Sequence, residues 1–212
     1  MIKIFALAVS LLCAPLLLAG ESATEPEGAA ASWQELHAGN EVGNISSLQR
    51  GARNFTNYCL GCHSMKYLRW SRMGSDLKIP PAQLKANLIP PGATPADYIQ
   101  SSLRAEDGIA WFGKEPPDLS LMARARGVDY IYRFLKTFYV DPTRATRTNN
   151  LALDAAAMPA VLSELEGVKA GVFKNVEVIV DGKPTVQKVF DHFERVAKKC
   201  VCMPRRNRSS IM

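Results

Sequence analysis

The spacing of apolar residues predicts a chain built mainly from short helices. Around residues 46–58 apolar side chains recur at intervals of three and four, which places them on one face of a helix; they are Ile45, Leu48, Ala52 and Phe55. Residues 129–140 show the same rhythm. Residues 94–104 open with Thr94 and Pro95, a pair typical of a helix start. We therefore expect three amphipathic helices.

The segments between these helices carry different patterns. A turn followed by a helix is expected over residues 59–72, a loop over 141–157, and a short helix over 159–165. In residues 175–190 valines alternate with polar residues on both sides of Asp181-Gly182, which is a strong hairpin signal. The predicted fold class is mainly α, with loop-rich insertions and a small β-hairpin.

The N-terminal segment has the layout of a secretory signal peptide. Met1-Ile2-Lys3 is a short positive start, an apolar run follows to Ala19, and polar residues begin at Glu21. The apolar run is shorter than the roughly 20 residues that span a bilayer. We therefore expect residues 1–20 to be removed together with Cys13, and residues 21–32, rich in Ala, Glu and Ser, to form an exported linker.

Composition places the remainder among ordinary globular proteins and argues against nucleic-acid binding. The chain is 47% hydrophobic and 22% charged, which suits one domain over residues 33–195. The net charge of +6 is mild, and much of it lies in a basic tail over residues 196–212. No basic stripe interleaved with aromatic residues runs through the domain, as a nucleic-acid surface would require.

The sequence Cys59-Leu60-Gly61-Cys62-His63 carries the chemistry of this chain. It is the attachment signature of c-type haem. Two thiols at this spacing reach the two vinyl groups of one porphyrin, and the histidine that follows is held beneath the iron. Gly61 lets the backbone lie close to the ring. Export agrees with this interpretation, because c-type haem is attached on the outer side of the membrane.

Other interpretations of the cysteine pair stay open at this point. A redox dithiol would have the same Cys-x-x-Cys spacing, but no βαβ pattern precedes it here. A zinc site would need Cys200 and Cys202 as its second half, and a Cys-x-Cys half-site is unusual. A haem enzyme such as a peroxidase would need an iron with an open coordination position.

A carrier of electrons needs a second axial ligand, and methionine and histidine side chains are the candidates. The candidates are His37, His192, Met65, Met73, Met122, Met158, Met203 and Met212. Met158 follows three alanines and precedes Pro159, so the backbone can approach a haem there and the loop is stiffened. Met65 is too near His63 in the sequence to reach the opposite face of the ring.

Several segments in order resemble the cytochrome c1 family. The segment from Tyr58 to Tyr67, with Arg69 after it, is similar to the haem segment of that family. Three further segments match in turn: Pro116-Pro117-Asp118-Leu119-Ser120-Leu121-Met122-Ala123-Arg124-Ala125-Arg126, Met158-Pro159, and Phe190-Asp191-His192-Phe193-Glu194. The resemblance covers residues 33–195 and implies a c-type cytochrome domain with one covalently attached haem c.

The resemblance also implies roles for individual residues. Seven take part in cofactor binding: Cys59 and Cys62 as thioether attachments, His63 and Met158 as axial ligands of the iron, Arg126 as partner of a haem propionate, and Tyr130 and Pro117 as lining of the haem pocket. An arginine offers a buried carboxylate two donors. Lys66, Arg69 and Arg72 recur at intervals of three, and we interpret them as a solvated face.

The function implied by the resemblance is one-electron transfer, not catalysis by this chain alone. The haem would take an electron from a Rieske iron–sulfur subunit and pass it to a soluble c-type cytochrome. The chain would lie beside cytochrome b in a quinol–cytochrome c oxidoreductase, at the periplasmic face of the bacterial inner membrane. Residues 196–212 differ from the last helix and membrane anchor of the family. The alternative is therefore a free periplasmic carrier or a truncated, non-assembling family member.

Overall fold

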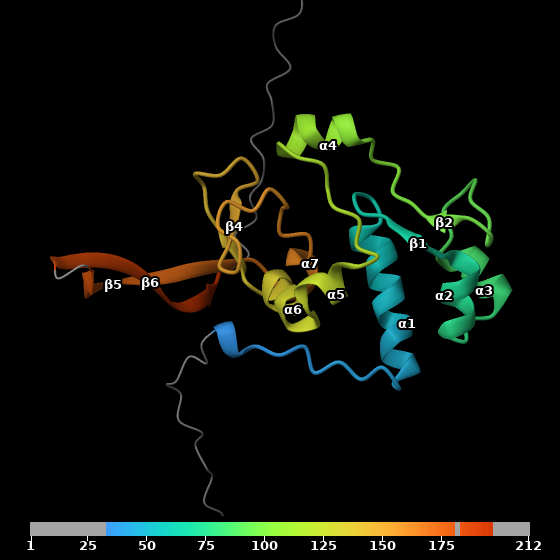
Figure 1. Cartoon of the computed structure of the whole chain (residues 1–212), viewed down its shortest axis with the longest axis horizontal. Helices are drawn as coiled ribbons and strands as arrows, with labels where there is room; N and C mark the ends of the chain where they lie inside the picture. The colour runs from blue at the N-terminus through green and yellow to red at the C-terminus, as the bar shows by residue number, and fades with distance from the viewer. Residues whose placement is uncertain (1–32, 181–182, 197–212) are drawn as a thin grey trace, which may run out of the picture.

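The computed structural model describes residues 33–180 and 183–196 (Figure 1). The expected signal peptide with Cys13, the linker, the tail with Cys200 and Cys202, and the hairpin turn at Asp181-Gly182 lie outside the described residues. The helices are α1 (Ile45–Asn54), α2 (Trp70–Asp76), α3 (Pro81–Asn87), α4 (Ala105–Phe112), α5 (Met122–Arg126), α6 (Val128–Lys136) and α7 (Ser163–Glu166). The strands are β1 (Met65–Arg69), β2 (Tyr98–Ile99), β3 (Phe138–Val140), β4 (Thr148–Asn150), β5 (Lys169–Val180) and β6 (Lys183–Arg195).

The predicted helix over residues 46–58 is confirmed as α1 and a π-helical turn, Phe55–Cys59, that continues it. The side chain of Asn44 caps its first turn by accepting a hydrogen bond from the amide of Ser47 at 3.0 Å. Ala52 on the predicted apolar face is buried. Because the helical backbone runs without a break to Cys59, it sets the direction in which the cysteine motif begins.

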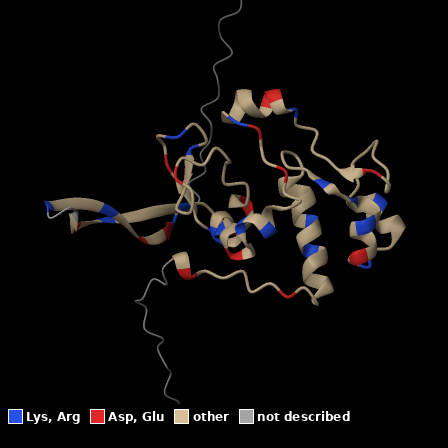
Figure 2. Ribbon diagram, viewed as in Figure 1, with Lys and Arg blue, Asp and Glu red and all other residues tan. Residues whose placement is uncertain are grey.

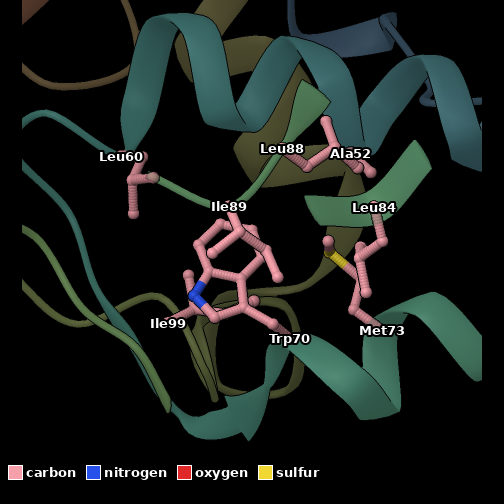
Figure 3. Packing of buried hydrophobic residues seen from close by; sticks show 8 residues of the cluster. All are labelled: Ala52, Leu60, Trp70, Met73, Leu84, Leu88, Ile89 and Ile99. Carbon is pink, nitrogen blue, oxygen red and sulfur yellow. The ribbon is translucent and has the colours of Figure 1, made fainter. Parts of the chain in front are cut away.

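One hydrophobic cluster packs α1 against α2, α3 and β2 (Figure 3). Trp70 and Ile99 lie at its centre and are 1% and 0% exposed. Leu60, from inside the cysteine motif, belongs to the same cluster. The full set is Ala52, Leu60, Trp70, Met73, Leu84, Leu88, Ile89 and Ile99. Burial of Leu60 therefore anchors the motif to the core of the protein.

The predicted helix over residues 94–104 is wrong. Asp97 accepts hydrogen bonds from the amide and hydroxyl of Thr94, at 2.7 and 2.9 Å, and this closes a turn. Tyr98 and Ile99 then form β2, which pairs antiparallel with β1. Burial of Ile99 in the core favours the extended backbone over the helix. The helix expected after the motif also begins later, because β1 precedes α2.

The helix expected over residues 129–140 ends early. Helix α6 stops at Lys136, and Phe138–Val140 form β3. Strand β3 pairs with β4, which lies in the segment expected to be loop. Phe138 is buried and its ring lies 5.1 Å from that of Phe134. Of the short helix expected over residues 159–165, only one turn is present, α7, which begins at Ser163 and ends at Glu166, and Gly167 with φ +81° follows it.

The predicted hairpin is confirmed but is much longer than expected. Strands β5 and β6 pair antiparallel from Lys169↔Arg195 to Val180↔Lys183, and the ribbon projects from the body of the molecule (Figure 1). Its base packs on β3 through Tyr139 and Phe173, whose rings lie 5.4 Å apart. The mainly α prediction is thus confirmed only in part, since short helices share the fold with two-stranded antiparallel sheets. Over the described residues, no helix has the length and apolar character needed to cross a bilayer.

Candidate haem site

Three segments distant in the sequence meet around one largely apolar pocket. Its empty volume is about 540 Å³, including the part that is open to solvent. The lining residues are Cys59, Cys62 and His63 from the motif with Tyr58 before it, Phe112 at the end of α4 with Lys114, Pro116 and Pro117 after it, and Ala157, Met158, Pro159 and Val161 from the loop before α7. The structure therefore brings Met158 to the cysteine motif.

The cysteine motif folds as a tight turn at the end of the first helix. The amides of Cys62 and His63 both donate to the carbonyl of Cys59, at 3.0 and 2.8 Å. Cys59 and Cys62 are free thiols that line the same pocket. Burial, and then the neighbouring Cys62, raise the pKa of the Cys59 thiol. Both sulfur atoms are thus available for thioether bonds.

A carbonyl group determines the chemical form of His63. Its Nδ1 lies 2.8 Å from the carbonyl oxygen of Pro117. A carbonyl can only accept, so Nδ1–H is the donor and, in the neutral ring, Nε2 keeps a free lone pair. A histidine whose second nitrogen is held in this way is the usual form of a metal ligand. Pro117, predicted to line the pocket, does so and also orients the histidine.

The bend that carries Pro117 is held against the motif by Asp118. Its carboxylate accepts from the amides of Lys66, at 2.9 Å, and Ser120, at 3.0 Å. Burial works to raise the pKa of Asp118, but these hydrogen bonds outweigh it and hold the pKa below its ordinary value of 3.8. The amide of Leu119 adds a bond of 2.8 Å to the carbonyl of Ser64. Sequence reasoning assigned Asp118 no role, because its partners become neighbours only in the folded chain.

Among the described candidates for the second axial position, Met158 lies in the pocket and the others do not. His37 pairs with Asp129 and His192 with Asp191, each at 2.9 Å. Met73 is buried in the hydrophobic cluster. Met203 and Met212 lie outside the described residues. Of the described candidates, the structure therefore places Met158 beside the motif.

Arg126 and Tyr130 do not line the pocket around the motif. The guanidinium of Arg126 lies over the ring of Tyr130, 5.4 Å from its centre. Tyr130 in turn stacks on Phe134 at 6.3 Å. In the described part of the chain Arg126 makes no ion pair. Lys114, which sequence reasoning missed, is a charged residue that does line the pocket.

The basic residues after the motif are exposed and engaged locally. Arg72 pairs with Asp76 within α2, at 2.7 Å. Arg69 bonds to the carbonyl of Ala96 and stacks over the ring of Tyr98, 4.1 Å from its centre. Figure 2 shows basic and acidic residues scattered over the described elements, with no continuous basic stripe among them. Arg69 therefore stabilises the contact between β1 and β2 and is also part of the solvated basic face.

Comparison with known proteins decides between the interpretations of the motif. The sequence profile of the Cytochrome C1 family matches residues 40–172, more than half of the chain. The chain belongs to the cytochrome c1 family. It is 42% identical to cytochrome c1 of Allochromatium vinosum over 144 residues, covering 68% of this chain and 59% of that protein.

Two further relatives are similar over shorter stretches. The chain is 43% identical to the ammonia monooxygenase gamma subunit of Nitrosomonas europaea over 121 residues, which is 57% of this chain and 51% of that protein. It is 36% identical to cytochrome c1 of Rhodospirillum rubrum over 113 residues, which is 44% of this chain and 41% of that protein. The chain spans about half the length of the curated relatives it matches.

Family membership establishes covalently attached haem c as the cofactor, and the pocket fits it. Two free thiols, an imidazole nitrogen with a free lone pair and a thioether sulfur meet between apolar walls. Among the described residues, no group of three or more His, Cys, Asp or Glu side chains is placed so that it could hold a metal ion by itself. Sulfur and nitrogen donors around an apolar space are the donor set that haem iron takes.

Proposed function

We propose that this chain is a one-electron carrier, the haem subunit of a quinol–cytochrome c oxidoreductase. In this proposal it accepts an electron from a Rieske iron–sulfur protein and passes it to a soluble c-type cytochrome. The observation that carries the proposal is the convergence of Met158 with His63 in one apolar pocket. An iron with both axial positions filled by protein suits electron transfer, whereas a peroxidase would need one position open.

The pocket residues then have distinct tasks. Cys59 and Cys62 would hold the cofactor covalently, and His63 and Met158 would supply the axial ligands. The bound haem contributes one-electron chemistry between ferric and ferrous iron. The thioether of Met158 and the apolar walls both favour the ferrous state, so they raise the reduction potential. The carbonyl of Pro117 keeps the imidazole in one tautomer and one orientation.

Arg126 and Tyr130 have a less direct place in the proposal. The guanidinium of Arg126 is exposed and contacts only an aromatic ring in the described structure, so its donors are available to a carboxylate. We assign it to a haem propionate on this ground and on the family resemblance. Tyr130 would hold the guanidinium in place through the cation–π contact.

The proposed setting is a membrane complex at the periplasmic face of a bacterial inner membrane, with cytochrome b and the Rieske protein as partners. A relative from Candida albicans, 31% identical over 121 residues, is named as the catalytic subunit of a mitochondrial cytochrome b–c1 complex. The alternative is a free periplasmic carrier. Purification of the tagged chain from membranes distinguishes them: cytochrome b accompanies the subunit and is absent from the carrier.

The test of the haem assignment is an optical spectrum of the chain matured with c-type haem, beside Met158→Ala. The wild type should show a low-spin spectrum with a sulfur-to-iron charge-transfer band, and haem should stay attached after denaturation. Met158→Ala should keep the covalent haem but lose the band, and its reduction potential should fall. A wild-type protein without covalent haem, or a band that survives in Met158→Ala, would contradict the proposal.

A further inference from the structure

The loop that carries Met158 is fixed by hydrogen bonds to two adjacent buried asparagines. Asn149 and Asn150 end β4 and are 3% and 2% exposed. Their side chains reach along the loop that follows rather than into the hydrophobic cluster. Buried amides are costly unless their hydrogen bonds are made, so the bonds they make indicate what the pair does.

Asn150 joins the start of the loop to the C-terminal end of α6 by hydrogen bonds. Its Oδ1 accepts from the amides of Ala152, at 2.8 Å, and Leu153, at 3.1 Å. Its Nδ2 donates to the carbonyl of Phe134 at 2.7 Å. The hydroxyl of Thr137, which is fully buried, lies 3.2 Å from the same Oδ1. One side chain therefore joins two loop amides to the end of a helix.

Asn149 holds the middle of the loop, three residues before Met158. Its Oδ1 accepts from the amide of Ala155 at 3.0 Å, and its Nδ2 donates to Asp154 at 2.8 Å and to Asp141 at 3.3 Å. Arg144 lies between the two carboxylates, 3.1 Å from Asp154 and 3.6 Å from Asp141. The network thus ties the loop to the end of β3.

The bond to Ala155 matters because that residue has an unfavourable backbone conformation. Its φ is +57°, a left-handed value that costs a residue with a Cβ roughly 1 kcal/mol. After this turn the chain passes through Ala156, which is buried, and reaches Ala157 and Met158 at the pocket. A left-handed turn held by a buried side chain fixes where the chain goes next.

We propose that Asn149 and Asn150 are positioning residues for the sixth ligand, setting how firmly the thioether of Met158 is held at the haem iron. This inference rests on the proposed function, in which Met158 is that ligand. A merely structural network would lower stability when cut and leave the axial bond as it is. A positioning network would also make the sulfur easier to displace.

The experiment measures displacement of the methionine by an added ligand in the haem-loaded protein. Imidazole is titrated into wild type, Asn149→Ala and Asn150→Ala, and loss of the sulfur-to-iron band gives its apparent affinity. Leu84→Ala is the matched control, because it removes a buried side chain from the hydrophobic cluster without touching the loop. Asn150→Ser is a milder and neutral variant, because its hydroxyl keeps a polar group at this buried position without adding a charge.

The asparagine variants should bind imidazole about tenfold more tightly than wild type, the change expected for one or two lost hydrogen bonds. Leu84→Ala should bind it like wild type although it unfolds more easily. Wild-type imidazole affinity in both alanine variants would overturn the proposal. If the alanine variants do not mature, Asn150→Ser decides: a rise of about threefold supports the proposal and no change overturns it. A wild-type protein without the band would instead refute the proposed function.

Discussion

At the scale of single residues, the carbonyl of Pro117 determines which nitrogen of His63 is free. It accepts from Nδ1 of His63, so it leaves only Nε2 of the neutral ring to bind a metal. The carbonyl is kept in place by a neighbour, Asp118, whose carboxylate closes the bend onto β1. His63, the proposed proximal ligand, is thus oriented by residues more than fifty positions away in the sequence.

Replacing Asp118 by alanine should weaken the whole arrangement. Two backbone amides would lose their acceptor, so we expect a loss of about 1–3 kcal/mol in the free energy of unfolding. Urea denaturation of the haem-loaded protein, followed by its optical spectrum, measures this loss. Asp118→Asn, which retains one carbonyl oxygen, should lose less. Equal stability of wild type and Asp118→Ala would show that the bend does not depend on the carboxylate.

At the scale of elements, α4 is seated against the same bend through Gly108. A Cβ at this buried glycine would lie 2.7 Å from Cδ of Pro116, whose ring cannot turn away. Gly108→Ala should therefore displace the helix or the bend and cost about 1–3 kcal/mol. We also expect a higher reduction potential, because a weakened hydrogen bond from Nδ1–H of His63 to the carbonyl of Pro117 would make the imidazole a weaker donor to ferric iron. Ala110→Ser, at an exposed position of α4, is the control and should change neither quantity.

The outer half of the hairpin should be dispensable for the haem domain. Beyond Phe173 and Phe190 the ribbon projects into solvent, whereas its base packs on β3 (Figure 1). Replacing residues 176–187 by an Asn-Gly turn should leave the spectrum unchanged and the melting temperature within a few degrees. Phe173→Ala, at the base, should cost about 2 kcal/mol. A large loss from the shortened ribbon would show that its outer half has a partner within the chain.

At the scale of the whole molecule, a cluster of charges joins elements far apart in the sequence. Glu166 of α7 lies 2.9 Å from Lys136 of α6 and 2.7 Å from Lys169 of β5. Burial works to raise the pKa of Glu166, but the hydrogen bonds from Lys169 and Lys136 outweigh it, and the pKa lies below its ordinary value of 4.5. The hairpin is thereby fixed to the domain next to the loop that carries Met158.

This cluster should make stability depend on pH in a predictable direction. A carboxyl whose pKa is lowered by folding stabilises the protein above pH 4.5 and loses this effect as the pH falls through its folded value. Wild type should therefore exceed Glu166→Gln in stability at neutral pH, and the difference should shrink steadily below pH 4.5. Thermal melting of both proteins across this range measures it. A difference that is constant with pH would mean that the charge is not involved.

Much of this protein was predictable from local pattern. The cysteine motif, the helix that ends in it and the pairing of β5 with β6 all depend on patterns of residues close together in the sequence. Periodicity reports burial of one face, and a haem signature reports spacing along the chain. Both are properties of short segments, so both can be recognised without knowledge of the fold.

The tertiary structure alone decided the rest. Residues 94–104 and 138–140 carry acceptable helical patterns, yet Ile99 and Phe138 are buried in strands whose partners lie elsewhere in the chain. The bond of His63 to Pro117 and the clamp of Asn149 on Ala155 likewise depend on backbone groups, which every residue has. The sequence therefore does not show which carbonyl or amide forms such a bond. Folding determines which of them meets a ligand.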